Sequence, residues 1–296
     1  MATRAQRFDQ RQSMKNKRFE VFHYRDKRGE NVRLHHHDFY EIYFLLGGNV
    51  DFRIEGITHH LEPGDLLLIS PQELHQAQIS ADSLYERIVL WIDRGYLAGL
   101  GSGETDLAAC FGQGSAPHAN LLRPDKPRRA LLQDLLEKLV TEFYAGKPGG
   151  ELYSHALLLQ FMVEVNRLAV RGAAVSRRDE PDLVSQVLAY IGSHFQEELT
   201  LERIADEFYV SKYHLSHEFT GRVGVSVYRY VIFRRLMLAK ELMEDGAAPG
   251  TVYQTCGFGD YANFYRAFKA EYGVSPKAYF AEVSKNKRHL YKIPQK

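Results

Sequence analysis

Two histidines and a glutamate occupy alternating positions in the first part of this 296-residue chain. His35, His37 and Glu41 have the same parity, so one regular strand would place their side chains on the same face. Imidazole and carboxylate groups form hydrogen bonds with small polar molecules, and they are also nitrogen and oxygen donors of the kind that iron, manganese, nickel and zinc accept. The spacing therefore indicates a polar binding site and leaves the nature of its ligand open.

A second concentration of chemistry-bearing residues lies in the C-terminal half. Residues 211–240 contain six basic residues and one acidic residue, in a chain whose net charge is only +1. A basic patch of this size attracts phosphate groups. On charge alone, a solvated helix face explains the same pattern equally well. The preceding segment 19–181 is acidic by contrast, with 17 basic and 23 acidic residues.

Residues 19–95 have the pattern of short β-strands. The strand-like segments are rich in β-branched and aromatic residues, and turns containing Gly, Pro, Asn and Asp separate them. They cover residues 42–46, 50–54, 66–69 and 87–92. Several short strands at close spacing predict an antiparallel sandwich or barrel, which would position the histidine-rich face.

The spacing of the apolar residues changes later in the chain. The segment 96–126 is rich in glycine and is expected to be a loop with a short helix around 107–111. Apolar residues then recur at helical spacing from Pro127 and again over 151–171, on either side of a Gly- and Pro-rich turn. This pattern predicts an antiparallel helical hairpin. Its apolar surface either packs against the strands or forms a dimer interface.

The last third of the chain predicts a repeated pair of short helices. Ser211 and Asp260 are candidate N-caps, and each is followed by a helix whose inward residues lie four positions apart. These inward residues are Leu215 and Phe219 in the first helix and Phe264 and Phe268 in the second. The sequence Gly-Val-Ser ends the first helix at 224–226 and the second at 273–275, about 49 residues later. With a short helix before each, the sequence predicts two helix-turn-helix units.

Residues 182–284 resemble the C-terminal DNA-binding domain of AraC/XylS-type bacterial transcription regulators. The motifs that carry the resemblance occur in both helix pairs at the family's spacing. They include Val210-Ser211, Tyr213-x-Leu215-Ser216, Gly224-Val225-Ser226, Arg235-Leu236, Gly257-Phe258, Arg266-x-Phe268-Lys269 and Gly273-x-Ser275-Pro276. The chain departs from the family pattern at His217 and Tyr253, where the family commonly has Arg and Ala. These departures affect which DNA sequence the domain is expected to bind, and they leave its expected fold unchanged.

The resemblance implies that the second helix of each unit enters the major groove of DNA. The two units would then contact successive major-groove segments on one face of the double helix. The side chains implied to meet base edges are Tyr213, Ser216 and His217 in the first unit and Tyr261, Asn263 and Arg266 in the second. Those expected to meet phosphates are Ser211 at the helix N-terminus, Lys212, Thr220 and Lys269. For any one of these side chains, an ordinary exposed polar residue is the alternative explanation.

The histidine-rich region is similar to a cupin barrel, from its first histidines through Gly48 and the Pro63-Gly64-Asp65 turn to His75. In metal-binding cupins this pattern supplies three imidazoles and one carboxylate, which here would be His35, His37, Glu41 and His75. AraC-type sensors with such a barrel carry similar residues around a small-metabolite pocket without a metal. In that case the expected ligand-binding residues are His37, Glu41, Tyr43 and His75, and no cofactor is expected.

Together these patterns predict a two-domain protein. An N-terminal antiparallel, cupin-like β-barrel carries a helical hairpin, and the C-terminal domain is all-α with tandem helix-turn-helix units. The expected segments are a basic arm at 1–18, a sensor barrel at 19–126, a helical hairpin at 127–171, a linker at 172–181, the DNA-binding domain at 182–284 and a basic tail at 285–296. Two cysteines are too few for a disulfide framework, and the sequence predicts neither a secretory signal nor a membrane span, so we expect a cytoplasmic protein.

The predicted function is that of a transcriptional regulator that binds promoter DNA in response to a small molecule such as a sugar, and not that of an enzyme. Its expected partners are double-stranded DNA, the effector, a second copy of the chain and RNA polymerase. One alternative is a metal-dependent cupin enzyme fused to a DNA-binding domain, which tight stoichiometric metal would favour. Another is a constitutive DNA-binding protein whose barrel only dimerises, which a barrel filled by its own side chains would favour.

Overall fold

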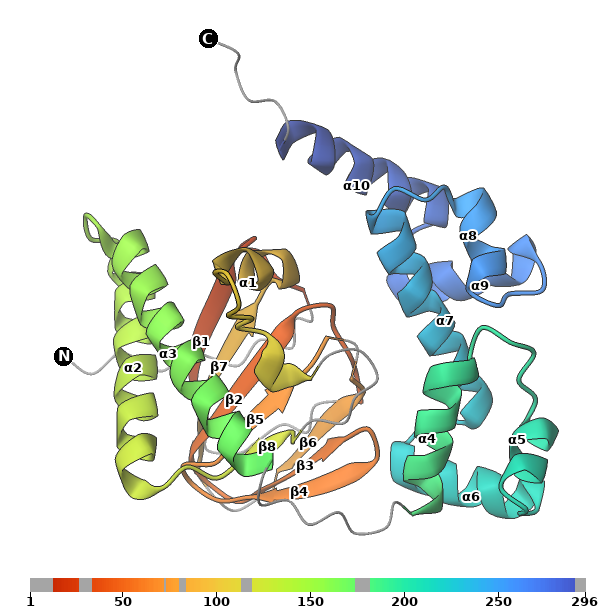
Figure 1. The fold of residues 1–296 in the computed structure, drawn as a ribbon, viewed down its shortest axis with the longest axis horizontal. Helices are drawn as coiled ribbons and strands as arrows, with labels where there is room; N and C mark the ends of the chain where they lie inside the picture. Colours follow the sequence, from red (N-terminus) through yellow and green to blue (C-terminus); the bar gives the residue numbers. More distant parts are fainter. Residues whose placement is uncertain are drawn as a thin grey trace. The chain divides into compact units, whose positions relative to one another are not determined.

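The computed structural model describes residues 13–26, 34–71, 73–79, 84–112, 119–173 and 182–290 (Figure 1). The chain divides into two compact units, Met1–Asp179 and Glu180–Lys296. The first contains the β-sheets and the second is helical, so the predicted combination of fold classes is confirmed. Most of the predicted basic arm, most of the linker and the end of the basic tail lie outside the described residues.

In the described part of the first unit, eight strands form two sheets. They are β1 (Phe19–Asp26), β2 (Tyr40–Gly47), β3 (Val50–Ile54), β4 (Ile57–Leu61), β5 (Leu66–Ile69), β6 (His75–Ile79), β7 (Tyr85–Ile92) and β8 (Leu121–Leu122). One sheet has the strand order β1-β7-β2-β5-β8 and the other has the order β4-β3-β6. Neighbouring strands pair antiparallel throughout, as the sequence predicts.

The five-stranded sheet has two buried faces, and its side chains alternate between them. Tyr43 and Val89 belong to the cluster that this sheet shares with the three-stranded sheet. Phe44 and Leu90, one residue further along their strands, belong to the cluster on the opposite face. Because side chains in a strand have a period of two, parity decides which residues of β2 and β7 lie between the sheets.

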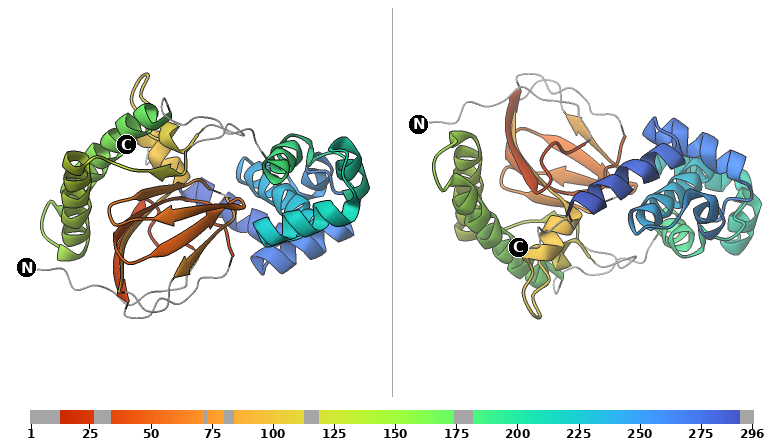
Figure 2. Two further views of the ribbon diagram at one scale, coloured as in Figure 1. Left: turned by 90° about the horizontal axis from the view of Figure 1, so that it is seen from below. Right: turned by 90° about the horizontal axis from the view of Figure 1, so that it is seen from above.

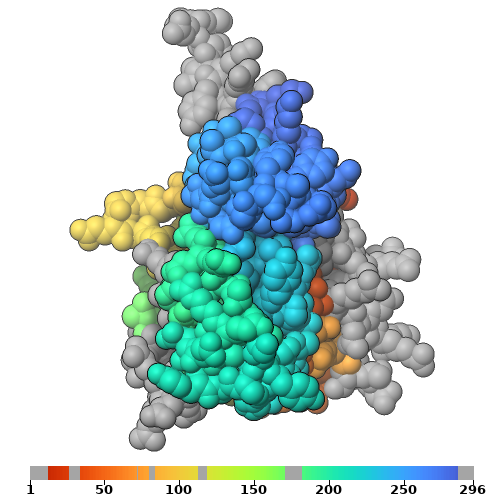
Figure 3. Space-filling view, turned by 90° about the vertical axis from the view of Figure 1, so that its right-hand side faces the viewer, coloured from red at the N-terminus to blue at the C-terminus, as the bar shows by residue number. Residues whose placement is uncertain are grey.

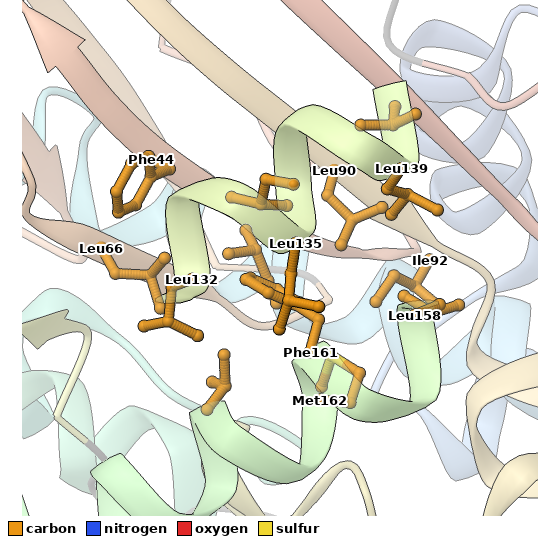
Figure 4. Packing of buried hydrophobic residues seen from close by; sticks show 14 of the residues in the cluster. Phe44, Leu66, Leu90, Ile92, Leu132, Leu135, Leu139, Leu158, Phe161 and Met162 are labelled. Atoms are coloured by element: carbon orange, nitrogen blue, oxygen red, sulfur yellow. The ribbon is translucent and has the colours of Figure 1, made fainter. Parts of the chain in front are cut away.

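A helical hairpin covers the second face of the five-stranded sheet (Figure 2). It consists of α2 (Lys126–Ala145) and α3 (Gly150–Ala173), and α2 ends at Gly146, whose φ of 60° lies in the left-handed region that glycine tolerates. Figure 4 shows the contact, in which the helix residues Leu132, Leu135, Leu139, Leu158, Phe161 and Met162 meet the strand residues Phe44, Leu66, Leu90 and Ile92. Each such side chain contributes about 1.5–3 kcal/mol through burial.

The segment 96–126 contains more regular structure than its glycine content predicts. Helix α1 (Arg94–Leu100) begins where the carboxylate of Asp93 accepts a hydrogen bond from the backbone N–H of Tyr96 (2.8 Å), and Leu97 within it is fully buried. A short 3-10 helix, η1 (Ala109–Phe111), forms near the expected position, and β8 pairs with β5. The expectation of a loop is therefore wrong for α1 and β8, because capping and contact with the core outweigh local composition.

The second unit contains seven helices in the part that the structure describes. They are α4 (Leu183–His194), α5 (Leu201–Glu207), α6 (Lys212–Val223), α7 (Val227–Glu244), α8 (Pro249–Thr255), α9 (Tyr261–Tyr272) and α10 (Pro276–Leu290). The pairs α5–α6 and α8–α9 are the two helix-turn-helix units, which α7 connects (Figure 1). In the space-filling view of Figure 3 the earlier helices, green to cyan, lie beside the later ones, blue. Among the described helices, none has both the length and the hydropathy that crossing a bilayer requires.

Candidate functional site

The histidine-rich segment does not form the single strand that its spacing predicts. β2 begins at Tyr40, so His35 and His37 precede it and only Glu41 belongs to it. An isolated antiparallel bridge instead joins His35 to His75, at the start of β6. The N–H of His35 donates to the carbonyl of His75 (3.1 Å), and the N–H of His75 donates to the carbonyl of His35 (2.9 Å). This backbone pairing brings together residues that lie far apart in the sequence.

Three imidazoles converge at this bridge. Ring nitrogens of His35, His37 and His75 all lie within 4.8 Å of one another. The ring of His75 has its centroid 4.2 Å from that of His35 and 4.8 Å from that of His37. His37 and His75 are buried, at 4% and 0% exposure, and His35 is half-buried. Within the described ranges, no other group of three or more His, Cys, Asp or Glu side chains is close enough to share a metal ion.

Backbone carbonyls determine which ring nitrogen carries the proton in two of these histidines. Nδ1 of His37 lies 2.9 Å from the carbonyl oxygen of Phe39, and Nδ1 of His75 lies 2.8 Å from that of Glu73. A carbonyl oxygen only accepts, so each Nδ1–H donates, and Nε2 keeps its lone pair in the neutral ring. Burial lowers the pKa of His37 to about 3 and the pKa of His75 well below its usual value, so both rings are neutral at physiological pH.

Glu41 brings a carboxylate to the same cluster. Its Oε2 accepts a hydrogen bond from the indole N–H of Trp91 (2.8 Å) and lies 3.1 Å from Nε2 of His37. Trp91 stands opposite Glu41 in the pairing of β2 with β7, so the register of the sheet creates this contact. Trp91 is not among the residues predicted from sequence, because a strand's own residues do not identify its pairing partner.

Tyr43 belongs to a second buried polar group on the same face of the sheet. Its hydroxyl donates a hydrogen bond to the hydroxyl of Tyr85. Arg87, only 3% exposed, forms an ion pair with Asp26, and its guanidinium carbon lies 4.0 Å from the ring centroid of Tyr85. Phe52 lies between Tyr43 and the histidines. Arg87 is not among the residues predicted from sequence, although it has the same parity as Val89 and Trp91, which lie between the sheets, and a charged residue at such a position is a usable signal.

Helix α6 presents the polar residues predicted for the first unit. Tyr213 is 83% exposed, and its ring lies 6.4 Å from that of His217. Lys212 and Thr220 are exposed, whereas Ser216 is half-buried. The helix begins where the hydroxyl of Ser211 accepts a hydrogen bond from a backbone N–H of its first turn, as expected for an N-cap.

Helix α9 carries a connected row of side chains. The carboxylate of Asp260 accepts a hydrogen bond from the side-chain amide of Asn263, whose oxygen accepts one from the guanidinium of Arg266. Arg266 is thereby held on the exposed face of the helix. Tyr261 is only 39% exposed, because its ring packs against that of Tyr253, 5.8 Å away. Tyr261 is therefore less exposed than Tyr213, the 83% exposed tyrosine near the start of α6.

The lysines of the two faces have different surroundings. The ammonium group of Lys212 lies 2.8 Å from a carboxylate oxygen of Glu202, which belongs to α5. Lys269 is exposed and has no acidic partner within ion-pair distance among the residues that the structure describes. A phosphate would have to displace Glu202 to pair with Lys212, whereas among the described residues no acidic side chain is paired with Lys269.

Two protein-family models match the chain. The model described as an AraC-like ligand binding domain matches residues 20–162, which include the histidine cluster. The model described as a helix-turn-helix domain matches residues 204–282, which include α6 and α9.

Curated relatives match most of the chain's length. The uncharacterized HTH-type transcriptional regulator YbfI of Bacillus subtilis is 30% identical over 237 residues, covering 77% of this chain and 80% of the relative. The HTH-type transcriptional activator RhaS of Enterobacter sp. is 27% identical, covering 82% and 85%, and the arabinose operon regulatory protein of Salmonella typhimurium is 27% identical, covering 79% and 82%. Among solved structures, fatty-acid-bound ToxT from Vibrio cholerae covers 90% of this chain and 96% of its own, at 17% identity and a TM-score of 0.38.

Proposed function

Because this chain belongs to the AraC family of ligand-responsive, DNA-binding transcription regulators, we propose where it binds each of its two kinds of partner. Helices α6 and α9 bind two successive segments of promoter DNA. The polar side chains between the two sheets of the first unit bind the effector. Regulation then requires that the effector binds one conformational state of the protein more tightly than another.

The DNA assignment is carried by the two capped helices of 12 residues, each with an exposed polar face, in units of matching construction. Base edges are contacted from α6 by Tyr213, Ser216 and His217. From α9 they are contacted by Asn263 and Arg266, and by Tyr261 at the edge of the contact surface. The guanidinium of Arg266 can donate two parallel hydrogen bonds to one guanine. Phosphates are bound by Lys212, Thr220, Lys269 and the N-terminus of α6 at Ser211.

Selection of bound duplexes from a random-sequence library by the full chain tests this assignment. We expect an enriched site with two conserved blocks about one helical turn apart. The pair of changes Asn263→Ala and Arg266→Ala should abolish preference in one block, and Tyr213→Ala with His217→Ala should abolish it in the other. Lys277→Ala, an exposed position on α10, serves as the control. If both double variants select the wild-type site, α6 and α9 are not the reading helices.

The proposed effector is a small molecule with several hydroxyl groups, such as a sugar. His37, Glu41 and His75 offer buried acceptors for hydroxyl groups in one cluster, and Tyr43 adds a hydroxyl nearby. One relative is named for the arabinose operon, which supports this class of effector.

A thermal-shift screen against pentoses, hexoses and their acids, with chelator present, tests the effector assignment. A compound at 100 times its Kd should stabilise the protein by about 2.7 kcal/mol. Glu41→Gln should remove the shift, and Glu62→Gln, an exposed glutamate of the same unit, should not. A compound that stabilises wild type and Glu41→Gln equally binds elsewhere.

A second copy of the chain is the proposed partner of the helical hairpin. Apolar side chains remain exposed on both of its helices after packing on the sheet, among them Leu152 at 75% and Tyr144 at 46% exposure. Leu152→Glu should shift the chain toward monomer in sedimentation equilibrium, whereas Glu137→Gln on the hydrophilic surface should not. A wild-type chain that is monomeric at micromolar concentration would contradict this assignment.

We further propose that the protein acts in the cytoplasm, where promoter DNA and RNA polymerase are found, and that it has no catalytic activity. The names of its relatives as transcriptional regulators support both statements. In vitro transcription from the selected site with purified RNA polymerase should change when the protein is added. Unchanged transcript levels with and without a stabilising compound would contradict a direct effect on the polymerase.

A further inference from the structure

A cavity of about 410 Å³ lies in the first unit, on the side of the five-stranded sheet that the hairpin covers. Its walls come from the residues just before β1, from the start of β1, from α1 and from the two hairpin helices next to the turn that joins them. None of its lining residues belongs to the histidine cluster, whose neighbours Phe39 and Trp91 lie between the two sheets. The volume is in the range of small-molecule sites, so this cavity is a second candidate binding site of the unit.

Three aromatic rings form one wall of the cavity. The ring of Phe19 has its centroid 5.5 Å from that of Phe143 on α2 and 6.2 Å from that of Tyr96 on α1. Phe19 is buried, whereas Phe143 and Tyr96 are half-buried and keep part of their surface accessible. The hydroxyl of Tyr96 lies 2.7 Å from Nδ1 of His155 on α3, which fixes the position of the ring. A wall of this kind accepts an apolar or aromatic side chain.

A buried hydroxyl without a partner also lines the cavity. Ser154, on α3, is 4% exposed, and its side chain has no hydrogen bond to any residue that the structure describes. A serine in a helix can donate to the carbonyl four residues before it, as Ser193 does to Ala189 at 3.1 Å. A buried hydroxyl left without a partner costs free energy, so a polar group of a bound molecule is expected at Ser154.

Two paired and two unpaired charged side chains line the cavity. Arg18 and Glu151 form an ion pair with each other. Glu142 and Lys147 have no oppositely charged partner within ion-pair distance in the described part of the chain. The four charges sum to zero, so the cavity favours a ligand without net charge. The free carboxylate and the free ammonium group favour a ligand that carries one positive and one negative group.

Gly150 lets the carboxylate of Glu142 approach the start of α3. Gly150 is buried, and a Cβ at this residue would lie 2.9 Å from Oε1 of Glu142. The φ of Gly150 is outside the left-handed region, so the backbone conformation does not require glycine here. The free N–H groups in the first turn of α3 favour a negative charge at this end of the helix. The missing side chain therefore serves the placement of the Glu142 carboxylate.

We propose that this cavity binds a free α-amino acid with an apolar or aromatic side chain. The ammonium group of the ligand pairs with Glu142, its carboxylate meets Lys147 and the hydroxyl of Ser154, and its side chain packs on the aromatic wall. A molecule held in this way connects the start of β1 with both hairpin helices, so its binding stabilises the first unit. The proposal depends neither on the effector site between the sheets nor on DNA binding.

Isothermal titration calorimetry of the full chain with L-phenylalanine tests the proposal. We expect one saturable site per chain. Phenethylamine lacks the carboxylate, 3-phenylpropionate lacks the ammonium group and free glycine lacks the side chain, so each should bind about 10-fold more weakly or worse. No saturable binding of L-phenylalanine or L-leucine up to about 10 mM would overturn the proposal. Phenethylamine or 3-phenylpropionate binding as tightly as L-phenylalanine would also overturn it, because the site would then not recognise both charges.

Substitutions at the charged groups locate the ligand. Glu142→Gln should weaken binding by about 10-fold or more, and Lys147→Gln by about threefold, because Lys147 is exposed to solvent. Gly150→Ala displaces the Glu142 carboxylate and should also weaken binding, while the thermal midpoint of the free protein stays unchanged or rises. The control Glu137→Gln removes an exposed carboxylate from the same helix as Glu142 and should leave the affinity unchanged.

Ser154→Ala separates a role in binding from a role in folding. Its hydroxyl has no partner among the described residues, so its removal should leave the thermal midpoint of the free protein unchanged and weaken binding by about 5–10-fold. If folded Ser154→Ala and Glu142→Gln both bind L-phenylalanine within twofold of wild type, the ligand is not in this cavity. Glu41→Gln, which changes the site between the sheets, should bind L-phenylalanine normally. Loss of binding in that variant would place the amino acid between the sheets and contradict the proposal.

Discussion

The two helix-turn-helix units of this protein share one frame but differ in their outward side chains. Both second helices begin at a side-chain cap, Ser211 or Asp260, and end at a left-handed glycine, Gly224 or Gly273. The fully buried inward residues occupy matching positions: Leu215 and Phe219 in α6, and Phe264 and Phe268 in α9. Counted from the caps, the outward pairs are Lys212 and Tyr261, His217 and Arg266, and Thr220 and Lys269.

This difference shows which constraints act on each face. The inward residues must fill a core and the ends must satisfy free backbone groups, so both units retain the same types of residue there. The outward residues lie outside these cores, although Tyr261 packs on Tyr253 and Lys212 pairs with Glu202, and under our proposal they match the DNA. We therefore expect the two halves of the binding site to differ in sequence, with the guanidinium of Arg266 making the second half the more selective.

Phe268→Ala should have the largest effect, lowering the free energy of unfolding by about 3–5 kcal/mol. Its ring lies close to those of Phe264 (5.6 Å), Tyr272 (4.6 Å) and Tyr279 (5.7 Å). Phe219→Ala should cost less, because in the described part of the chain the ring of Phe219 has one aromatic neighbour, that of Tyr230 at 5.7 Å. Urea unfolding followed by circular dichroism measures both, and a larger loss for Phe219→Ala would reverse the comparison of the two cores.

Thiol labelling should report the opening of the second unit. Burial raises the pKa of Cys256, in the core of that unit, and the pKa of Cys110, in the first unit, each to about 12. At pH 8 the thiolate fraction is then on the order of 1,000-fold lower than in a free cysteine. We expect iodoacetamide to modify neither thiol in the folded protein, and Cys256 alone in Phe268→Ala.

The same thiols predict a loss of stability in alkali. Their folded pKa values exceed those of the unfolded chain, so the folded state holds more protons between about pH 9 and pH 12. The contribution of these thiols to the free energy of unfolding is fully present below about pH 9 and declines as the pH rises toward 12.

For the labelling experiment, equal modification of both cysteines in Phe268→Ala, measured by mass spectrometry, would show that the two units do not open separately.

Arg266→Ala should weaken specific DNA binding by about 1–3 kcal/mol and relax the preference at one base position. His217→Ala, at the matching position of α6, should cost less, because an imidazole makes one contact where a guanidinium makes two. Fluorescence anisotropy with the selected duplex and its single-base variants measures both effects. A loss that is uniform across all variants would assign Arg266 to phosphate binding.

The two N-caps should differ in strength. The carboxylate of Asp260 accepts hydrogen bonds from both the backbone and the side chain of Asn263, whereas Ser211 accepts one, from the backbone N–H of His214 at 3.2 Å. We expect Asp260→Ala to cost about 1–2 kcal/mol and Ser211→Ala about 0.5–1 kcal/mol. Amide hydrogen exchange in the first turns of α6 and α9 measures the difference, and Asp260→Asn should retain most of the cap.

The lysines should give the smallest effects. Lys269→Ala should reduce the dependence of log Kd on log salt by about one, because an exposed ammonium group is lost from the phosphate contacts. Lys212→Ala should change it less, since Lys212 already pairs with Glu202. That pair is exposed and therefore weak, so Glu202→Gln should free Lys212 and tighten DNA binding slightly. Equal salt slopes for the two lysine variants would indicate that the ion pair does not survive in the complex.

The helical unit was largely predictable from sequence because its signals are local. The caps at Ser211 and Asp260, the inward residues four positions apart and the terminal glycines all act within one helix or its ends. The packing of Tyr261 against Tyr253 was not predictable in this way, because it joins the two helices of the second unit. It lowers the exposure of Tyr261 to 39%, although the position of this residue on α9 alone predicts an outward side chain.

The sheet unit was predictable as a class of fold but not as a site. The sequence predicts that His37 and Glu41 lie together because they share one face of a strand. The two side chains do lie together, but His37 precedes β2, which begins at Tyr40, so a shared strand is not the reason. The segments of β1, β4 and β6 carry weaker strand signals than the four named by composition, and β8 lies in a region rich in glycine. Their strand conformation depends on pairing with neighbours.

The sequence by itself determined which residue types are present for binding and where the helices of the second unit begin and end, since capping and apolar spacing are short-range. Only the tertiary structure decided which of the polar groups meet. The bridge between His35 and His75 and the register that sets Trp91 opposite Glu41 join residues 40 and 50 positions apart. Strand pairing fixes such contacts through hydrogen bonds between distant backbones, which no local pattern of side chains specifies.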